Sequence, residues 1–287
     1  MHERKMRKIA LETVCYVAGA GAFSVFIRWL QTMLAYNEQG LVDKSVFNLL
    51  VPAIMIASAL VFRNFIKKFQ KECYALPEDF FALLKNESNI YSALRWIIGL
   101  VMIFGAGLLL AECETDKDAA FLKVLSILGA LSGLSFSLLL TDANKPHIAK
   151  RGTICLLSAV PVVFFSFWLI TCYKVNSINP VLWDYSVEIV TLIVCILSFF
   201  RLAGSEYSVV KSWRSMFLAM LGGALCIMIV ADERYMGMQL MYISAAAMQI
   251  YYVWVMLCNM TQGEKEVEAK SDDGFEHMSV FKKKQEM

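Results

Sequence analysis

The sequence predicts an all-α, polytopic integral membrane protein with eight transmembrane helices. Of its 287 residues, 58% are hydrophobic and only 18% are charged, and the mean hydropathy is +0.56. A soluble protein of this length could not bury so much apolar surface. The apolar residues form continuous runs of about 20, which is the length of a helix that crosses a bilayer. A transmembrane β-barrel would show short segments of alternating hydrophobicity instead.

The first apolar run follows a basic segment that resembles the start of a signal peptide. This run reaches about residue 35, which is too long for a cleavable signal, so we expect a retained first helix. Between the second and third runs, Pro77 followed by Glu78 and Asp79 predicts a short helix, either on the inner membrane surface or packed on its neighbours. The eight predicted spans are residues 10–35, 46–66, 92–111, 119–141, 153–173, 181–201, 214–231 and 235–258.

The distribution of lysine and arginine predicts that both termini are cytoplasmic. With the N-terminus inside, most of the 27 basic residues fall in inner segments, as the positive-inside rule requires. We therefore expect residues 1–260 to form a transmembrane domain of the plasma (cytoplasmic) membrane. Residues 261–287 carry mixed charge and few apolar side chains, which predicts a disordered cytoplasmic tail. The basic residues expected in outer segments are Lys44, Lys117, Lys123, Lys174 and Arg234.

The eight spans divide into two sets of four with the same orientation, which raises the hypothesis of two four-helix halves. The second span of each set ends in Phe-Arg, at Phe62-Arg63 and Phe200-Arg201. A duplicated unit of this kind is typical of transporters with parallel repeats. The alternative is chance similarity, since apolar sequences align easily.

The span 181–201 carries a stripe of polar residues on one face. Asp184, Glu188, Thr191, Cys195 and Ser198 follow a 4-3-4-3 spacing, which places them on one side of a helix among valine, leucine, isoleucine and phenylalanine. Such a stripe would be unfavourable against lipid, because a charged group in the membrane is tolerated only if it is paired, protonated or hydrated. We therefore expect this face to look into protein or water.

Two further spans present polar faces in the same half of the membrane. Arg28 is the one lysine or arginine well inside a predicted span, and Gln31 shares its face. The last span offers Gln239 and Tyr242 at helical spacing. One interpretation is an outward-opening cavity with Glu188 as its anionic or proton-carrying pole and Arg28 as its cationic pole. The alternatives are a buried Arg28–Glu188 pair that only fixes packing, and an Arg28 that extends to the membrane surface. In the cavity interpretation, the lining would be Asp184, Gln31, Thr191, Gln239 and Tyr242.

Proline and glycine mark two other features of the helices. Pro161 lies midway along the fifth span and must free the carbonyl near Leu157, so it is a candidate hinge or an ordinary kink. Gly129 and Gly133 form a small-xxx-small pattern, which favours close helix packing. Such Gly/Ala-rich faces would join helices within the chain, or serve a homo-oligomer or a membrane partner.

These patterns favour a small-solute transporter or ligand-binding membrane protein, for a zwitterion, an organic cation or a proton-coupled solute. The alternatives are a non-catalytic scaffold or subunit of a larger membrane complex and, third, an intramembrane lipid-modifying enzyme. The sequence has no HExxH, GxSxG or P-loop motif, so we lean against catalysis. The eight cysteines are scattered and the three histidines lie in polar segments, so we expect no metal or cofactor. The inner lysines follow the positive-inside rule and do not indicate nucleic-acid binding.

Overall fold

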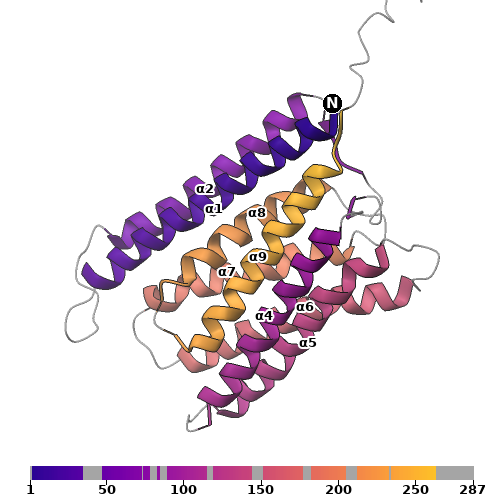
Figure 1. The fold of residues 1–287 in the computed structure, drawn as a ribbon. Coiled ribbons are helices and arrows are strands. Elements are labelled where there is room, and N and C mark those ends of the chain that lie inside the picture. The colour runs from indigo at the N-terminus through magenta and orange to yellow at the C-terminus, as the bar shows by residue number, and fades with distance from the viewer. Residues whose placement is uncertain are drawn as a thin grey trace, which may run out of the picture.

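The computed structural model describes residues 2–34, 47–72, 74–77, 83–84, 89–114, 119–143, 151–176, 182–204, 212–232 and 234–262. Within these residues, eight long helices form an elongated bundle (Figure 1). A short antiparallel pair of strands, β1 (Tyr74–Ala75) and β2 (Thr261–Gln262), joins the ends of the second and last long helices. The long helices are α1 (His2–Leu34), α2 (Phe47–Lys71), α4 (Asn89–Glu112), α5 (Ala119–Ala143), α6 (Arg151–Asn176), α7 (Leu182–Gly204), α8 (Ser212–Ile229) and α9 (Met236–Cys258).

Each of the eight predicted spans corresponds to one of these helices, and each helix is long and apolar enough to cross a membrane. The prediction of an all-helical, multi-pass membrane protein is confirmed to that extent. The membrane concerned, the cytoplasmic side of the termini and the two four-helix halves stay predictions. The short helix expected after Pro77 falls largely on residues 78–82, and the tail on residues 263–287, outside the described residues.

Helices α8 and α9 form the centre of the bundle. In α9, 72% of the most apolar stretch is buried, against 17% in α2, which lies with α1 along one side (Figure 1). Helix α9 packs against α4, α8 and α1, while α8 also contacts α7. This position explains why the last helix carries alanine, serine and glutamine where an outer helix would carry large apolar residues.

Glycine allows three of the helices to approach backbone to backbone. A Cβ atom on Gly99 of α4 would lie 2.6 Å from the carbonyl oxygen of Gly133 in α5, and one on Gly133 would lie 2.7 Å from that of Gly99. Gly237 at the start of α9 meets the backbone of α4 at Gly105 in the same way. The small-residue pattern at Gly129 and Gly133 therefore serves packing within the chain.

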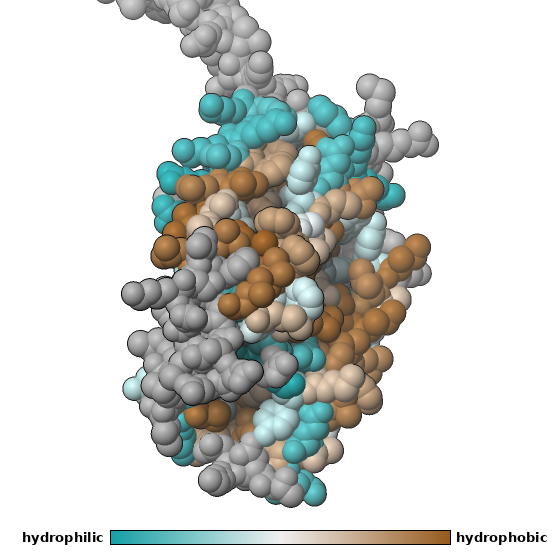
Figure 2. Space-filling view, turned by 90° about the vertical axis from the view of Figure 1, so that its left-hand side faces the viewer, coloured by the Kyte–Doolittle hydropathy of each residue, from teal (hydrophilic) through white to brown (hydrophobic). Residues whose placement is uncertain are grey.

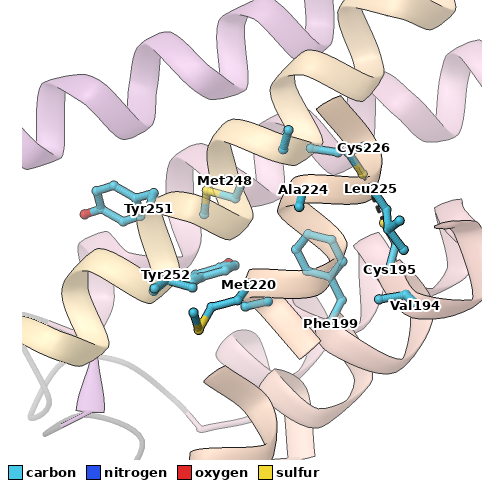
Figure 3. Packing of buried hydrophobic residues seen from close by; sticks show 14 of the residues in the cluster. Val194, Cys195, Phe199, Met220, Ala224, Leu225, Cys226, Met248, Tyr251 and Tyr252 are labelled. Atoms are coloured by element: carbon cyan, nitrogen blue, oxygen red, sulfur yellow. Dashed lines mark hydrogen bonds between the residues drawn. The ribbon is translucent and has the colours of Figure 1, made fainter. Parts of the chain in front are cut away.

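The inner face of α7 packs on α8 and α9, as the polar stripe predicts. Figure 3 shows Cys195 of α7 directed towards Cys226 of α8. The two sulfur atoms are 3.3 Å apart and both residues are fully buried. The side-chain amide of Gln249 in α9 also donates a hydrogen bond to the Cys195 sulfur, at 3.1 Å.

The surface has the hydropathy pattern of a membrane protein. Figure 2 shows a wide band of hydrophobic residues on one face, with hydrophilic residues gathered at the end where α1 begins. Exposed lysines at that end include Lys5 of α1 and Lys67, Lys68 and Lys71 of α2. This is the arrangement expected when basic helix ends lie in the headgroup region.

Candidate functional site

Glu188 of α7 is buried, accepts two hydrogen bonds and forms one ion pair. The Tyr242 hydroxyl in α9 donates to its Oε1 atom at 2.8 Å. The Nη1 atom of Arg234 lies 2.7 Å from Oε2, and the Cys172 thiol of α6 donates to the same oxygen at 3.0 Å. Only 1% of the Glu188 side chain is exposed. The carboxylate is therefore held by groups from three different parts of the chain.

Arg28 of α1 lies at a second position in the same network, and its ionic partner is Asp232. The Arg28 Nε atom donates to Oδ1 of Asp232 at 2.7 Å and its Nη2 to Oδ2 at 3.3 Å, while Nη1 donates to Gln31 at 2.7 Å. The hypothesis of an Arg28–Glu188 pair is therefore wrong in its partner. The reason is the turn between α8 and α9, which the sequence predicts as an outer loop. This turn folds inward and supplies both counter-charges.

Arg234 links the two halves of the network. Its Nη2 atom lies 3.3 Å from Oδ2 of Asp232, so Arg28, Asp232, Arg234 and Glu188 form a chain of alternating charge. Burial by itself would lower the pKa of Arg234, but the neighbouring carboxylates, Glu188 first, outweigh it and raise this pKa above its ordinary value. The Arg234 guanidinium therefore stays charged.

The turn that carries Asp232 and Arg234 is fixed to the helices around it. Helix α8 ends at Ile229, whose carbonyl accepts a hydrogen bond from the Asp232 backbone N–H at 2.9 Å. The Gln239 side chain of α9 donates to the Asp232 carbonyl at 3.0 Å. The Glu112 carboxylate accepts from the backbone N–H of Gly237 at 3.1 Å, a favourable place for negative charge because the N–H groups of a helix start lack partners.

The remaining predicted site residues have different surroundings. Thr191 is buried, and its hydroxyl donates to the Val187 carbonyl of its own helix. The side chain of Asp184 lies outside the described residues. Helix α6 is continuous through Pro161, and the Leu157 carbonyl accepts a hydrogen bond from Ser135 of α5. Because proline has no N–H, this bond replaces the helical one that Pro161 cannot make. The hinge role of Pro161 stays a prediction.

A pocket of about 860 Å³ reaches this network from the end of the bundle where α4 and α6 finish and α9 begins. Glu188, Arg234 and Gln239 form part of its polar lining. Leu122, Trp168 and Met238 form part of its apolar lining. Arg28, Gln31, Thr191 and Tyr242 do not line it. The structure therefore places Glu188 and Gln239 at the pocket. Arg28 does not line it and is linked to the lining residue Arg234 through Asp232.

Several residues of the pocket wall were not predicted from the sequence, among them Trp168, Cys172 and Arg234. Trp168 is fully buried, and its ring centroid lies 4.3 Å from that of Tyr242. Among the described residues, neither its Nε1 atom nor the Nε atom of Arg234 has a hydrogen-bond partner. Trp168 and Cys172 both have the apolar character of an ordinary span, so their sequence gives no signal of a site. Asp232 and Arg234 have the sequence context of an outer loop, and that context does not show that their turn bends towards Arg28 and Glu188.

The described residues contain no group of three or more histidine, cysteine, aspartate or glutamate side chains suited to a metal ion. Comparison of the chain with protein-family models, with curated proteins and with solved structures finds no match. The pocket and its charged residues are therefore the features that bear on function.

Proposed function

We propose that this chain is a ligand-binding membrane protein, a transporter of a small solute, and that the pocket ending at Arg234 and Glu188 is its binding site. The observation that supports this most directly is that a pocket of about 860 Å³ reaches an ion pair whose carboxylate is buried. Pockets for small molecules are commonly about 300–1,000 Å³, mostly apolar, with a few converging polar groups. The lining around Glu188 and Arg234 has this composition.

The placement of charge also favours a functional role. Charged side chains within membrane spans are costly and are most often found at ligand or ion pathways. If the pair served only to hold the helices together, apolar residues of similar size at the same positions would often give equal or greater stability. Here the pair is accompanied by a second one, Arg28–Asp232, and one end of the network is open to the pocket.

The network offers a means of coupling binding to helix movement. A solute that competes for Arg234 would compete with both Glu188 and Asp232, and Asp232 also holds Arg28 of α1. Binding would then change the contact between the α8–α9 turn and α1. In the topology expected from the lysine and arginine distribution, this end of the bundle faces away from the cytoplasm. The proposal is therefore a site that receives solute from outside.

The test is the accessibility of the pocket to a small thiol reagent. Met238→Cys places a thiol in the pocket wall, and Met248→Cys places one at a fully buried position of the same helix. Both variants, in membranes, are treated with the small neutral reagent methyl methanethiosulfonate, and labelling is measured at each peptide by mass spectrometry. We expect Met238→Cys to be labelled many times faster than Met248→Cys.

Equal rates at the two positions would contradict a pocket that admits solute. The same Met238→Cys variant in intact cells tests the side of the membrane. An anionic, membrane-impermeant methanethiosulfonate should label it from outside if the pocket opens outward. Labelling only after the cells are broken would place the opening on the cytoplasmic side and overturn the proposed orientation.

A further inference from the structure

The hydrogen-bond donors at the end of the pocket indicate what its ligand presents. We infer that the ligand binds through an oxygen that accepts hydrogen bonds, a carbonyl or a carboxylate, from Trp168 and Arg234. Glu188 is then a positioning residue that holds Arg234, and the site does not select an organic cation. This inference rests on the proposed function, since it concerns the ligand of the same pocket.

Glu188 is already occupied. Tyr242 donates to one carboxylate oxygen, and Arg234 and Cys172 donate to the other. Two carboxylate oxygens offer about four acceptor positions, so three are in use inside a buried site. A ligand ammonium group would be limited to the one remaining acceptor position, or it would displace Arg234 and leave that largely buried guanidinium with Asp232 as its carboxylate partner. The geometry therefore argues against Glu188 as the pole that binds a cation.

The site contains two hydrogen-bond donors that lack an acceptor in the part of the chain that the structure describes. The Trp168 Nε1 and Arg234 Nε atoms are buried and without a partner among the described residues, and both residues line the pocket. An indole and a guanidinium are donors only, so water or a ligand oxygen can satisfy them and another N–H cannot. Buried polar atoms of this kind are rare in native structures and call for an explanation. A ligand oxygen provides one.

The residues that carry the two donors are linked through the Glu188 carboxylate. The Trp168 ring packs on Tyr242 with centroids 4.3 Å apart, the Tyr242 hydroxyl reaches Glu188, and Glu188 contacts Arg234. Both residues also line the pocket, and the inferred oxygen binds at this end of it. The apolar lining from Leu122, Trp168 and Met238 suits a hydrocarbon or aromatic body attached to that group.

The experiment uses three probes with the same aromatic body. Benzamide carries a neutral carbonyl, benzoate a carboxylate, and benzylammonium a cation without an acceptor. Each is tested for protection of Met238→Cys from methyl methanethiosulfonate, with labelling followed at that peptide. We expect benzamide, benzoate or both to slow the labelling at concentrations where benzylammonium does not. Protection by benzamide alone would assign a neutral carbonyl, and protection by benzoate alone a carboxylate.

A matched pair of variants tests the role of the indole N–H. Trp168→Phe keeps an aromatic ring and removes the donor, and we expect it to raise the half-protecting probe concentration about tenfold. Trp254 also has a buried Nε1 atom without a partner among the described residues, but it lines a different pocket. Trp254→Phe should therefore leave protection unchanged. Equal protection in the native protein and Trp168→Phe would overturn the assignment of Trp168.

The outcomes separate this inference from the proposed function. Protection by benzylammonium that equals or exceeds that of the two acceptors would overturn the inference and leave the pocket intact. Free labelling of Met238→Cys with no protection by any of the three probes would also overturn it. Failure of the neutral reagent to label Met238→Cys at all would instead overturn the proposed function.

Discussion

Arg28 and Asp232 are joined by two hydrogen bonds, one of them 2.7 Å long, although 204 positions separate them in the chain. The pair fixes the first helix to the turn that precedes the last one. The same aspartate accepts the guanidinium of Arg234, so the contact between α1 and this turn is continuous with the wall of the pocket.

Removal of the Arg28 charge should destabilise the protein strongly. Arg28→Gln leaves Asp232 buried with Arg234 as its remaining cation, and the loss of one partner of a buried pair costs about 3–5 kcal/mol. Because Arg234 remains, we expect a loss near 3 kcal/mol in the free energy of unfolding, measured in detergent with a chemical denaturant. Gln31→Met, which removes a neutral acceptor from Arg28 and keeps both charges, is the control and should cost less. An unchanged stability in Arg28→Gln would contradict the pair.

Glu188 and Arg234 should be energetically coupled. Arg234→Gln leaves the buried Glu188 charge without its cation, and Glu188→Gln leaves Arg234 with Asp232 as its carboxylate partner, whereas the double variant removes both charges together. We expect the double variant to be more stable than the sum of the single losses by about 1–3 kcal/mol. The measurement is a double-mutant cycle of unfolding free energies. Simple additivity would show that the two groups do not interact.

The Tyr242 hydroxyl should contribute to stability where a similar hydroxyl in the same helix does not. Tyr242→Phe removes a hydrogen bond to a charged acceptor, which is worth about 1.5–3 kcal/mol. The Tyr252 hydroxyl is buried without a partner among the described residues, so Tyr252→Phe should be neutral or slightly stabilising. Melting temperatures of the two purified variants make the comparison. A larger loss in Tyr252→Phe would argue against the hydrogen bond to Glu188.

The crossing of α9 over α4 should depend on the absence of a side chain at Gly237. A Cβ atom there would lie 2.6 Å from the carbonyl oxygen of Gly105, a backbone atom that cannot turn away. We expect Gly237→Ala to cost about 1–3 kcal/mol through overpacking. Gly107 has nothing within 4 Å of its Cβ position, so Gly107→Ala should be neutral or gain up to about 1 kcal/mol in helix propensity. Equal stability of the two variants would contradict this crossing.

Cys195 and Cys226 should form a disulfide under a lipid-soluble oxidant. Their sulfur atoms are 3.3 Å apart, and a disulfide needs an approach of only about 1 Å more. Treatment of membranes with molecular iodine oxidises the two thiols to one disulfide and yields two iodide ions and two protons. Peptide mapping should find this cross-link in the native protein. It should be absent when Cys195→Ala or Cys226→Ala is present, and a preferred link to Cys113 or Cys258 would contradict the packing of α7 on α8.

The number and places of the helices follow from the sequence because each apolar run is long enough to cross a bilayer and is bounded by polar residues. The face of α7 that turns inward is also readable, since Glu188, Thr191 and Cys195 recur at helical spacing. Both features are local, so they depend on residues close together in the chain.

The ionic partners of Arg28 and Glu188 cannot be predicted from local sequence patterns. Helical periodicity shows that Arg28 and Glu188 lie on polar faces, but it does not show which helix each face meets. Asp232 and Arg234 have the appearance of loop residues, and only the fold reveals that their turn bends into the bundle. Trp168 gives no signal at all, because a tryptophan in an apolar span is ordinary, and its role depends on a neighbour in another helix.

The distance in sequence between Arg28 and Asp232 has a consequence for biosynthesis. When α1 enters the membrane, the chain that contains Asp232 has not yet been made, so Arg28 arrives without the carboxylate that later balances it. An arginine within a membrane span costs about 2.5–3.5 kcal/mol on insertion scales. The first helix should therefore be held weakly until the α8–α9 turn is synthesised. Nascent chains that stop before residue 232 should be the ones that quality-control proteases recognise.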